Sequence, residues 1–315
     1  MTKKAGALWF ITKRFTWSER DKHLQLTDCT ITKQGVVVSV YMPDSITANF
    51  EQKILAISDI HKDSIYCDEK MLKRDLDRAA EIGAWVFCNG DWFDGQQGRK
   101  DPRGRREELK PIFATKSNYS DLIVEESYEF LKPYRSILLC VARGNHEYSY
   151  LRHNDTDLIA RLLGALNSGQ DHKVQEGGYG GWLRFMYHHS KTTPRGRITY
   201  KYNHGGGGNA PVTRGMIQTN RQAAATTDAD ITHNGHNHQE YITNIPKESI
   251  NNKGQLEIRN QIYIRTPGYK SVFQKDQEGS SWEYQMGSPT PLGGVWVTLG
   301  STDGKPAITE VSKTF

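Results

Sequence analysis

The chain has 315 residues, of which 36% are hydrophobic and 24% are charged, so it is long enough to bury a substantial core. Its formal net charge of +5 at pH 7 is mild for this length and does not by itself indicate nucleic-acid binding. A mean hydropathy of -0.68 and the absence of long apolar runs argue against a membrane span. We therefore expect a soluble protein that forms one domain with extended ends.

The first 50 residues alternate like strands. The apolar stretch AGALWFI at 5–11 lies between basic residues, is short for a signal peptide and lacks a convincing cleavage site, so we interpret it as a strand. We expect residues 1–50 to form a strand-rich extension, with a small sheet of its own, that packs on a core domain of residues 51–315.

From residue 51 onward, buried strands alternate with helices. QKILAISDIH predicts a strand at 54–57, and the following helix has Asp68 as its N-cap and Gly83 as its stop. AWVFCNGD predicts the next strand, and SILLCVARGNHE predicts another that runs into a polar turn. SDLIVEESYEFLKPY and DTDLIARLLGALN have helical periodicity. This alternation predicts an α/β core with parallel strands.

From about residue 182 the chain becomes rich in strands. WLRFMYHH and ITYKYNH are predicted strands, separated by the turn-like KTTPRGR at 191–197. A glycine-rich segment then leads into a helix that Pro211 is placed to start. EYITNI, LEIRNQIYIRTPG and VWVTLGSTDGKPAITEV predict further strands, and Asp303-Gly304 is typical of a hairpin turn.

The four cysteines are Cys29, Cys67, Cys88 and Cys140. They are widely spaced, contain no C-x-x-C pair, and three of them lie in or beside apolar segments. Reduced packing thiols are therefore a better interpretation than a disulfide framework, and we expect a cytoplasmic protein.

Metal-binding side chains follow the predicted strand ends. In α/β sheets, ligands gather at the carboxyl ends of the strands, so these loops are expected to converge. They contribute Asp59, His61, Asp91, Asn145, His146, His204, His236 and His238. The spacing of His236 and His238 predicts that both lie on one side of an extended segment, while Gly235 allows close backbone approach. Oxygen and nitrogen ligands without a thiolate suit Mn²⁺, Fe or Zn²⁺.

These residues form five blocks, D-x-H, G-D-x-x-D, G-N-H-E, H-G and G-H-x-H, in that order between about residues 53 and 240. The chain thereby resembles the calcineurin-like metallophosphoesterases. The resemblance implies an αββα sandwich of two mixed sheets flanked by helices, with two divalent metal ions, of which Mn²⁺ is favoured. It assigns Asp59, His61 and His238 to one ion, Asn145, His204 and His236 to the other, and Asp91 to both.

The resemblance also implies how a phosphoester is cleaved. Water activated by the two ions would attack phosphorus. His146 matches no metal ligand of the family and would protonate the leaving oxygen, while Asp94 would orient its imidazole.

Several residues allow a second interpretation. His188 and His189 also end an apolar strand and are rivals of His204 for the fourth block. His233 matches no block and is interpreted as a structural histidine. Glu147 is either a loop salt-bridge partner or a catalytic group. The run Gly205 to Gly208 lacks the pattern of a phosphate-binding loop and is interpreted as a rim beside the metals.

The five blocks do not distinguish among the possible phosphoester substrates. We expect a phosphodiesterase that acts on nucleotides or nucleic acid, because G-H-x-H is similar to that branch and an arginine-rich loop follows Asp94. The arginines expected to contact phosphates are Arg99, Arg103, Arg105 and Arg106. A Ser/Thr protein phosphatase or phosphomonoesterase is the alternative, although Gly95 replaces the arginine that follows G-D-x-x-D in the protein phosphatases. A non-catalytic scaffold fits least, because the ligand set is complete.

Overall fold

A computed structural model gives the arrangement of most of the chain. It describes residues 24–43, 50–96, 101, 106–114, 117–190, 193–208, 210, 212–251, 253–275, 284–285, 287–302 and 305–314. The predicted strand at 5–11 lies outside these ranges. Within them, no helix combines the length and the apolar character that crossing a bilayer requires.

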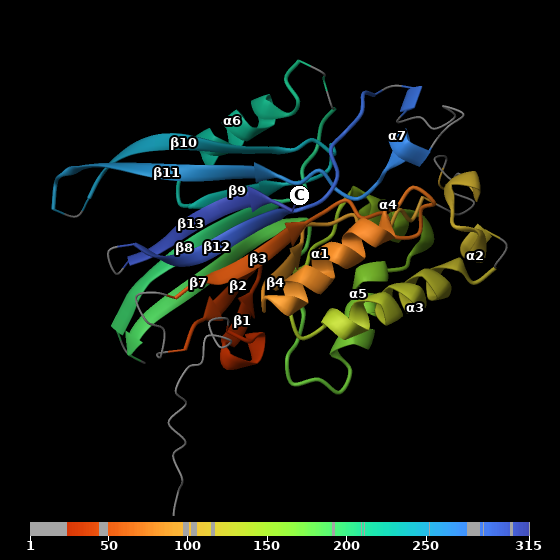
Figure 1. Cartoon of the computed structure of the whole chain (residues 1–315), viewed down its shortest axis with the longest axis horizontal. Helices are drawn as coiled ribbons and strands as arrows, with labels where there is room; N and C mark the ends of the chain where they lie inside the picture. Colours follow the sequence, from red (N-terminus) through yellow and green to blue (C-terminus); the bar gives the residue numbers. More distant parts are fainter. Residues whose placement is uncertain are drawn as a thin grey trace, which may run out of the picture.

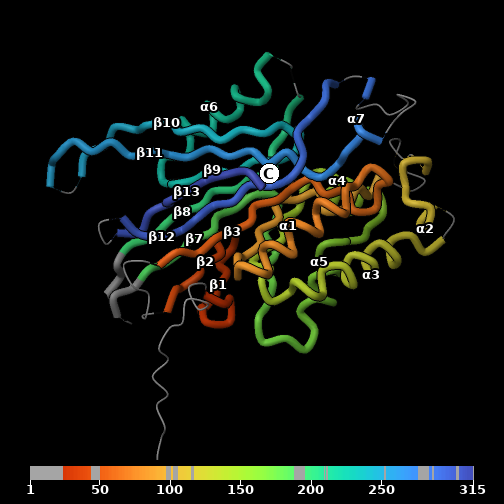
Figure 2. The backbone as a smooth tube through the Cα atoms, in the orientation of Figure 1, coloured from red at the N-terminus to blue at the C-terminus, as the bar shows by residue number. Residues whose placement is uncertain are grey.

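A six-stranded sheet carries the strands predicted first. In spatial order it contains β13 (Lys305–Lys313), β12 (Val295–Thr302), β3 (Gln52–Ile57), β4 (Trp85–Cys88), β5 (Leu138–Val141) and β6 (Gln175–Glu176). The strands from β3 to β6 are parallel, as predicted, whereas β12 is antiparallel to both β3 and β13. Strand β12, late in the chain, therefore lies beside the first core strand, β3 (Figure 2). Asp303 and Gly304 lie outside the described residues, but the flanking strands pair as the predicted hairpin requires.

A seven-stranded sheet packs against the first. In spatial order it contains β1 (Thr30–Gln34), β2 (Val37–Tyr41), β7 (Gly180–Ser190), β8 (Thr193–Asn203), β9 (Ile231–Asn234), β11 (Leu256–Arg265) and β10 (Tyr241–Ile250). β2 pairs parallel with β7, so the described part of the N-terminal extension joins this sheet and does not form its own. The predicted turn at 191–197 was also too long, because β8 already begins at Thr193 and pairs with the end of β7.

Helices cover the outer faces of the two sheets (Figure 1). They are α1 (Glu69–Glu81), α2 (Pro111–Ala114), α3 (Tyr119–Leu131), α4 (Asn145–Asn154), α5 (Leu158–Asn167), α6 (Met216–Ala225) and α7 (Val272–Lys275). Short 3₁₀ segments are η2 (Leu26–Asp28), η3 (Arg106–Glu108) and η4 (Lys132–Tyr134). α1, α3, α4 and α5 lie together on one side of the strands, and α6 lies on the other side, next to β10 (Figure 1).

The helix boundaries test the capping predictions. Asp68 caps α1 by accepting a hydrogen bond from the backbone N–H of Met71 at 3.1 Å, as predicted. Pro211 lies outside the described residues and does not start α6, which begins at Met216 after Gly215 at φ 83°. The start of α4 was not predicted: what the sequence indicated as a polar turn after β5 is the first turn of a helix.

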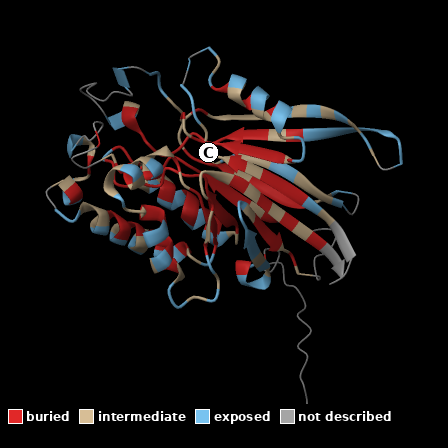
Figure 3. Ribbon diagram, turned by 180° about the vertical axis from the view of Figure 1, so that it is seen from behind, coloured by how far each residue is buried: buried red, intermediate tan, exposed pale blue. Residues whose placement is uncertain are grey.

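Two apolar cores hold the layers together. Along β4, Val86 faces the core beneath the helices, whereas Trp85 and Phe87 face the core between the sheets. Figure 3 shows the buried strands between helices that are buried on their inner faces. All four cysteines are free, and Cys67, Cys88 and Cys140 are buried, which confirms their interpretation as packing thiols. The order helix, sheet, sheet, helix confirms the predicted αββα fold class.

Candidate metal centre

The predicted ligands meet where the strands end. Asp59 and His61 follow β3, Asp91 follows β4, His204 follows β8, and the two histidines of NGHNH follow β9. Asn145 and His146 lie on the first turn of α4, which follows β5. Three groups each place one ligand atom per residue within 4.8 Å of one another: Asp59, His61 and His238; Asp91, His204 and His236; and His61, Asp91 and His146. Two of these groups match the two predicted halves of the centre.

The first half contains Asp59, His61 and His238. The Nε2 atom of His238 lies 3.6 Å from Oδ1 of Asp59. His61 is 1% exposed, and within the described residues neither of its ring nitrogens has a hydrogen-bond partner. Because an unsatisfied buried imidazole costs free energy, a metal ion that accepts its lone pair would satisfy it. The residues of this half therefore fit a metal ion.

The second half contains Asp91, Asn145, His204 and His236. Oδ1 of Asn145 lies 2.7 Å from Nδ1 of His236 and 3.1 Å from Nε2 of His204. Nδ1 of His204 donates to the carbonyl oxygen of Asn89 at 2.7 Å, which directs Nε2 toward the site. A carboxylate, an amide oxygen and two imidazoles are ligands that Mn²⁺, Fe and Zn²⁺ accept in proteins.

His188 and His189, the alternatives to His204 for the fourth block, lie at the far end of the same hairpin. His188 pairs with Pro194, whereas Gly180, at the other end of β7, pairs with Asn203, directly before His204. Eight residues of strand separate the two ends, a distance of about 26 Å. The backbone thus places His204, and not His188, beside the other predicted ligands.

Asp91 lies between the two halves. Its Oδ2 atom is 3.1 Å from Nε2 of His204 and 3.8 Å from Nε2 of His146. Burial acts to raise the pKa of Asp91, but the neighbouring imidazoles of His204 and His146 hold that pKa well below its usual range. A buried carboxylate that remains ionised is suited to a position between two cations.

Glu147 anchors the loop that carries Asp91. Its carboxylate accepts hydrogen bonds from the backbone N–H groups of Asp91 at 3.1 Å, Phe93 at 2.9 Å and Gly144 at 2.8 Å. Burial and the charge of Asp91 raise the pKa of Glu147 to about 7. The interpretation as a loop salt-bridge partner was therefore wrong, because this side chain binds backbone groups inside the protein.

Glycines allow two close approaches at the centre. A Cβ atom on Gly144 would lie 2.0 Å from Oδ1 of Asp91, and one on Gly235 would lie 2.6 Å from Oδ2 of Asp59. Either contact is sterically impossible without a shift of the ligand. The role predicted for Gly235, to bring the histidine turn close to the other loops, agrees with this geometry.

Left-handed backbone is concentrated at the predicted ligands. Asp59, His61, Asp91, His236 and His238 have φ angles of 52°, 49°, 51°, 76° and 53°. The prediction that the two histidines of NGHNH lie on one side of an extended segment was therefore wrong. The turn instead sends His236 to the second half and His238 to the first. Such angles are strained for side-chain-bearing residues and cluster at functional sites.

His146 lies against both halves, with Asp94 behind it. Oδ1 of Asp94 is 3.0 Å from Nδ1 of His146, and the rings of His146 and His61 have centroids 4.6 Å apart. Burial lowers the pKa of His146, but the charges of Asp91 and Asp94 outweigh burial and raise it to about 9. The imidazole is thus protonated at neutral pH in the metal-free protein, with Nε2 facing the centre.

Other side chains at the centre carried no sequence signal. The ammonium of Lys270 lies 3.6 Å from Oδ2 of Asp94, although no motif marks the TPGYK segment. The ring of Tyr179 packs edge-on against His204, with centroids 5.6 Å apart, and Tyr148 packs against Tyr179. Tyr148 is 40% exposed, so its ring reaches the surface beside the centre.

His233 has the structural role that its sequence context indicated. It is fully buried in β9, where Nδ1 lies 3.0 Å from the hydroxyl of Tyr200 and Nε2 lies 2.9 Å from Oγ1 of Thr266. Burial lowers its pKa to about 3, so the ring stays neutral. Trp92 and Phe93 are likewise buried and pack in the core.

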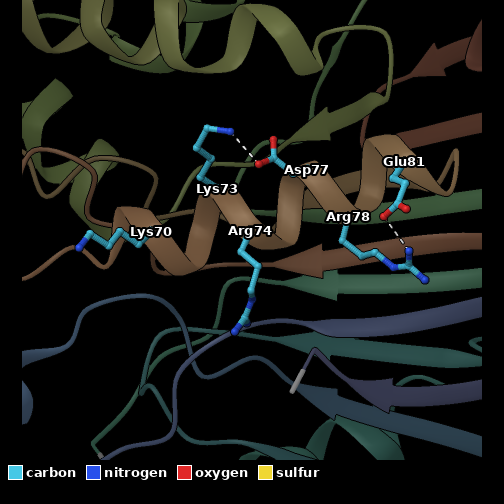
Figure 4. Close-up of a pocket in the computed structure, with 6 residues that line it drawn as sticks. All are labelled: Lys70, Lys73, Arg74, Asp77, Arg78 and Glu81. Atoms are coloured by element: carbon cyan, nitrogen blue, oxygen red, sulfur yellow. Dashed lines mark hydrogen bonds and ion pairs between the residues drawn. The ribbon is translucent and has the colours of Figure 1, made fainter.

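Most of the arginine-rich loop falls outside the described residues. This applies to Arg99, Arg103 and Arg105, whereas Arg106 opens η3 and is exposed. A separate surface hollow runs along α1 and is lined by Lys70, Lys73, Arg74, Asp77, Arg78 and Glu81 (Figure 4). Ion pairs join Lys73 to Asp77 and Arg78 to Glu81 at 2.7 Å, so acidic neighbours neutralise part of its charge. It contains none of the predicted ligands.

Comparison with known proteins identifies a family. Residues 52–260 match the model of the calcineurin-like phosphoesterases, which is more than half of the chain. Among solved structures, the calcineurin-like phosphoesterase YfkN from Bacillus subtilis is 12% identical over 84% of this chain and 90% of its own, with a TM-score of 0.36. A metallophosphoesterase from Sphaerobacter thermophilus is 12% identical over 84% and 89%, with a TM-score of 0.33. No curated protein matches.

Proposed function

Since the chain belongs to the calcineurin-like phosphoesterases, and is thus a metal-dependent hydrolase of phosphoester bonds, we propose that it is a two-metal phosphodiesterase acting on nucleotides or nucleic acid. The observation that carries the proposal is the pair of ligand groups on either side of Asp91, with His146 against both. We propose Mn²⁺ as the favoured metal, with Fe or Zn²⁺ as alternatives that the same ligands accept.

The two halves would divide the ligands as the resemblance implies. Asp59, His61 and His238 would hold one ion, the other three ligands would hold the second, and Asp91 would contact both. When bound, the ions would lower the pKa of a coordinated water to about 7 and neutralise charge on the phosphoryl oxygens. An anionic Asp91 between two cations also offsets their mutual repulsion.

His146 is the proposed proton donor to the leaving oxygen. Nδ1 donates to the backbone carbonyl of Asp94 at 2.5 Å, and the carboxylate of Asp94 lies 3.0 Å away. Nε2, which lies 3.2 Å from the side-chain amide nitrogen of Gln96, is therefore the nitrogen that would face the substrate. Protonation matters most when an alkoxide leaves, as in the cleavage of a nucleic-acid backbone. Cations bound beside Asp91 would oppose its effect on this imidazole and would lower the pKa of His146 from its value in the metal-free protein.

Two observations favour a diester over a phosphoprotein or a monoester. A monoester dianion requires more positive charge than a singly charged diester. Gly95 occupies the position where the protein phosphatases have an arginine after G-D-x-x-D. Arg143 of RGNHE is engaged in ion pairs with Asp157 at 2.6 Å and Glu176 at 2.7 Å. Neither position therefore offers an uncommitted guanidinium to a dianionic phosphate.

The proposal is tested by substrate preference in Mn²⁺. We expect bis-p-nitrophenyl phosphate to be hydrolysed faster than p-nitrophenyl phosphate, and single- or double-stranded DNA to be cleaved. Faster hydrolysis of the monoester and of a phosphopeptide would instead support the phosphatase alternative. If no phosphoester is hydrolysed with any of the three metals, the proposed function is wrong.

The arginine-rich loop has a separate test. If Arg99, Arg103, Arg105 and Arg106 contact backbone phosphates, DNA affinity falls steeply with salt concentration, and the slope becomes shallower when they are replaced. An unchanged slope in a variant with all four arginines changed to glutamine would exclude the loop from substrate binding.

A further inference from the structure

Tyr148 is an exposed aromatic residue on the helix that begins with Asn145 and His146. It follows Asn145 by three positions in α4, and residues three positions apart are neighbours on the surface of a helix. His146 precedes Tyr148 by two positions, and residues with that spacing do not face each other. Tyr148 therefore lies on the side of α4 that carries Asn145, a predicted ligand of the second half.

Two ring contacts connect Tyr148 to this half of the centre. The ring of Tyr148 packs edge-on against Tyr179, and the ring of Tyr179 packs edge-on against His204, each pair with centroids 5.6 Å apart. The rings of Tyr148 and His204 are therefore at most about 11 Å apart. The sugar and base of a nucleotide extend over a distance of this order from their phosphate. A phosphate bound beside His204 would thus carry its base within reach of Tyr148.

Tyr179 gives Tyr148 a fixed support. Its hydroxyl donates to the carbonyl of Gly205 at 2.5 Å, and its backbone carbonyl accepts a hydrogen bond from the N–H of His204 at 2.9 Å. Side chain and backbone thus both tie Tyr179 to the loop that carries the predicted ligand. A ring that is held in place before binding loses little conformational freedom when a substrate covers it.

Tyr148 is held by its neighbours and still presents ring surface to solvent. The guanidinium of Arg143 lies over its ring at 5.9 Å from the centroid, and ion pairs with Asp157 and Glu176 hold that guanidinium. Tyr148 nevertheless remains 40% exposed. A flat exposed ring suits a flat ligand, and every nucleobase has a face that can stack on an aromatic side chain.

We propose that Tyr148 is a substrate-binding residue that stacks on the nucleobase of the nucleoside that keeps the phosphate. The proposal rests on the proposed function of this centre and adds a base to what it recognises. The ring of His146, the proposed donor to the leaving oxygen, lies 4.6 Å from that of His61, whereas Tyr148 reaches the centre through His204. The leaving group and the retained nucleoside would therefore lie toward different halves.

Substrates with one leaving group but different retained groups test the proposal. We would compare the 5′ and 3′ p-nitrophenyl phosphate esters of thymidine with methyl p-nitrophenyl phosphate, in Mn²⁺. We expect Tyr148→Ala to raise KM for the preferred thymidine ester about tenfold, with kcat unchanged, because a stacked base is lost. Both constants for the methyl ester should stay unchanged. Tyr148→Phe should retain the KM of the parent protein, whereas Tyr148→Leu, which is apolar but not aromatic, should show the loss.

A control separates stacking from general damage. Tyr128→Ala removes a tyrosine of α3 whose ring also lies beneath a cation, with Nζ of Lys132 at 5.4 Å from the centroid, and it should leave all constants unchanged. An equal rise in KM for the methyl ester, an unchanged KM for the thymidine esters, or a Tyr148→Leu protein that behaves like the parent would overturn the stacking role.

A second readout does not require activity. Isothermal titration calorimetry of the Mn²⁺-loaded protein would compare thymidine 5′-monophosphate with inorganic phosphate. We expect Tyr148→Ala to weaken binding of the nucleotide about tenfold and to leave binding of phosphate unchanged. A parent protein that binds both equally, or neither, would reject the inference, as would unchanged nucleotide affinity in the variant. If the expected difference is found in a protein that hydrolyses no ester, the stacking role stands and the proposed function is wrong.

Discussion

The two halves of the predicted metal centre differ in how the protein holds them. In the half with His204 and His236, the amide of Asn145 lies within hydrogen-bonding distance of both rings, and the carbonyl of Asn89 fixes one of them. In the half with Asp59, His61 and His238, no described residue hydrogen-bonds the ring of His61. The first arrangement is set by the protein itself, whereas the second would be completed by a bound ion.

This difference indicates how the centre divides its tasks. Pre-oriented ligands lose less conformational freedom on binding, so we expect the half around Asn145 to hold its ion more firmly. The half around His61 adjoins Asp94 and His146 and is therefore the side on which the proposed proton transfer would take place. Five substitutions test this difference.

The largest effect is expected from Asp91→Ala, because Asp91 is proposed to contact both ions and lies within ligand distance of His61 as well as of His204 and His236. We expect loss of both ions and a fall in activity of about a thousandfold or more, since the metals supply most of a barrier reduction of at least about 8 kcal/mol. Metal content by mass spectrometry and kcat/KM would be measured together. A fully active Asp91→Ala protein would refute the shared position.

His146→Ala should separate chemistry from metal binding. We expect kcat to fall about 10²- to 10⁴-fold, while both ions remain bound, because His146 is the proposed proton donor and is not one of the proposed ligands. His153→Ala, a histidine on the same helix, is the matched control and should retain full activity. Loss of an ion from His146→Ala would show that the group of His61, Asp91 and His146 is itself a metal site.

The stability of variants of the metal-free protein allows a direct comparison of the two halves. His204→Ala should lower the free energy of unfolding by about 1–3 kcal/mol, because the buried carbonyl of Asn89 loses its donor. His61→Ala should cost less than about 1 kcal/mol, because it also removes unsatisfied buried nitrogens. Urea unfolding in the presence of a chelator measures both free energies of unfolding. A larger decrease for His61→Ala than for His204→Ala would contradict the proposed difference between the halves.

The smallest effect on the centre is expected from His233→Gln, since His233 belongs to neither half. Its folded pKa of about 3 lies below its ordinary value of 6.5, so the unfolded chain binds the proton first and stability falls as pH drops below 6.5. Between pH 6.5 and pH 5 the loss from this group is about 2 kcal/mol. The variant should keep its metals and show a shallower decline of unfolding free energy with acid; identical pH profiles would contradict this.

The sequence predicted which side chains meet at the centre better than it predicted their surroundings. Asp59, Asp91 and Asn145 follow strands whose apolar runs are unmistakable, and the carboxyl ends of parallel strands meet at one edge. The contact between Lys270 and Asp94 could not be predicted, because it joins residues that are 176 positions apart in the chain.

Two local predictions failed for a different reason. Helix α4 has no apolar periodicity, and its buried side chains are only Glu147 and Tyr150, so pattern reasoning indicated a turn. The rule that alternate residues share a face assumes an extended backbone, which His236 and His238 do not have.

The left-handed angles at five ligands have a consequence for the history of this fold. A side chain in that conformation is disfavoured by about 1–2 kcal/mol, and glycine avoids most of the penalty. Selection for thermal stability alone would therefore tend to replace these aspartates and histidines, and would produce a more stable protein without activity. Selection for catalysis, rather than for stability, would preserve these five residues in one cluster.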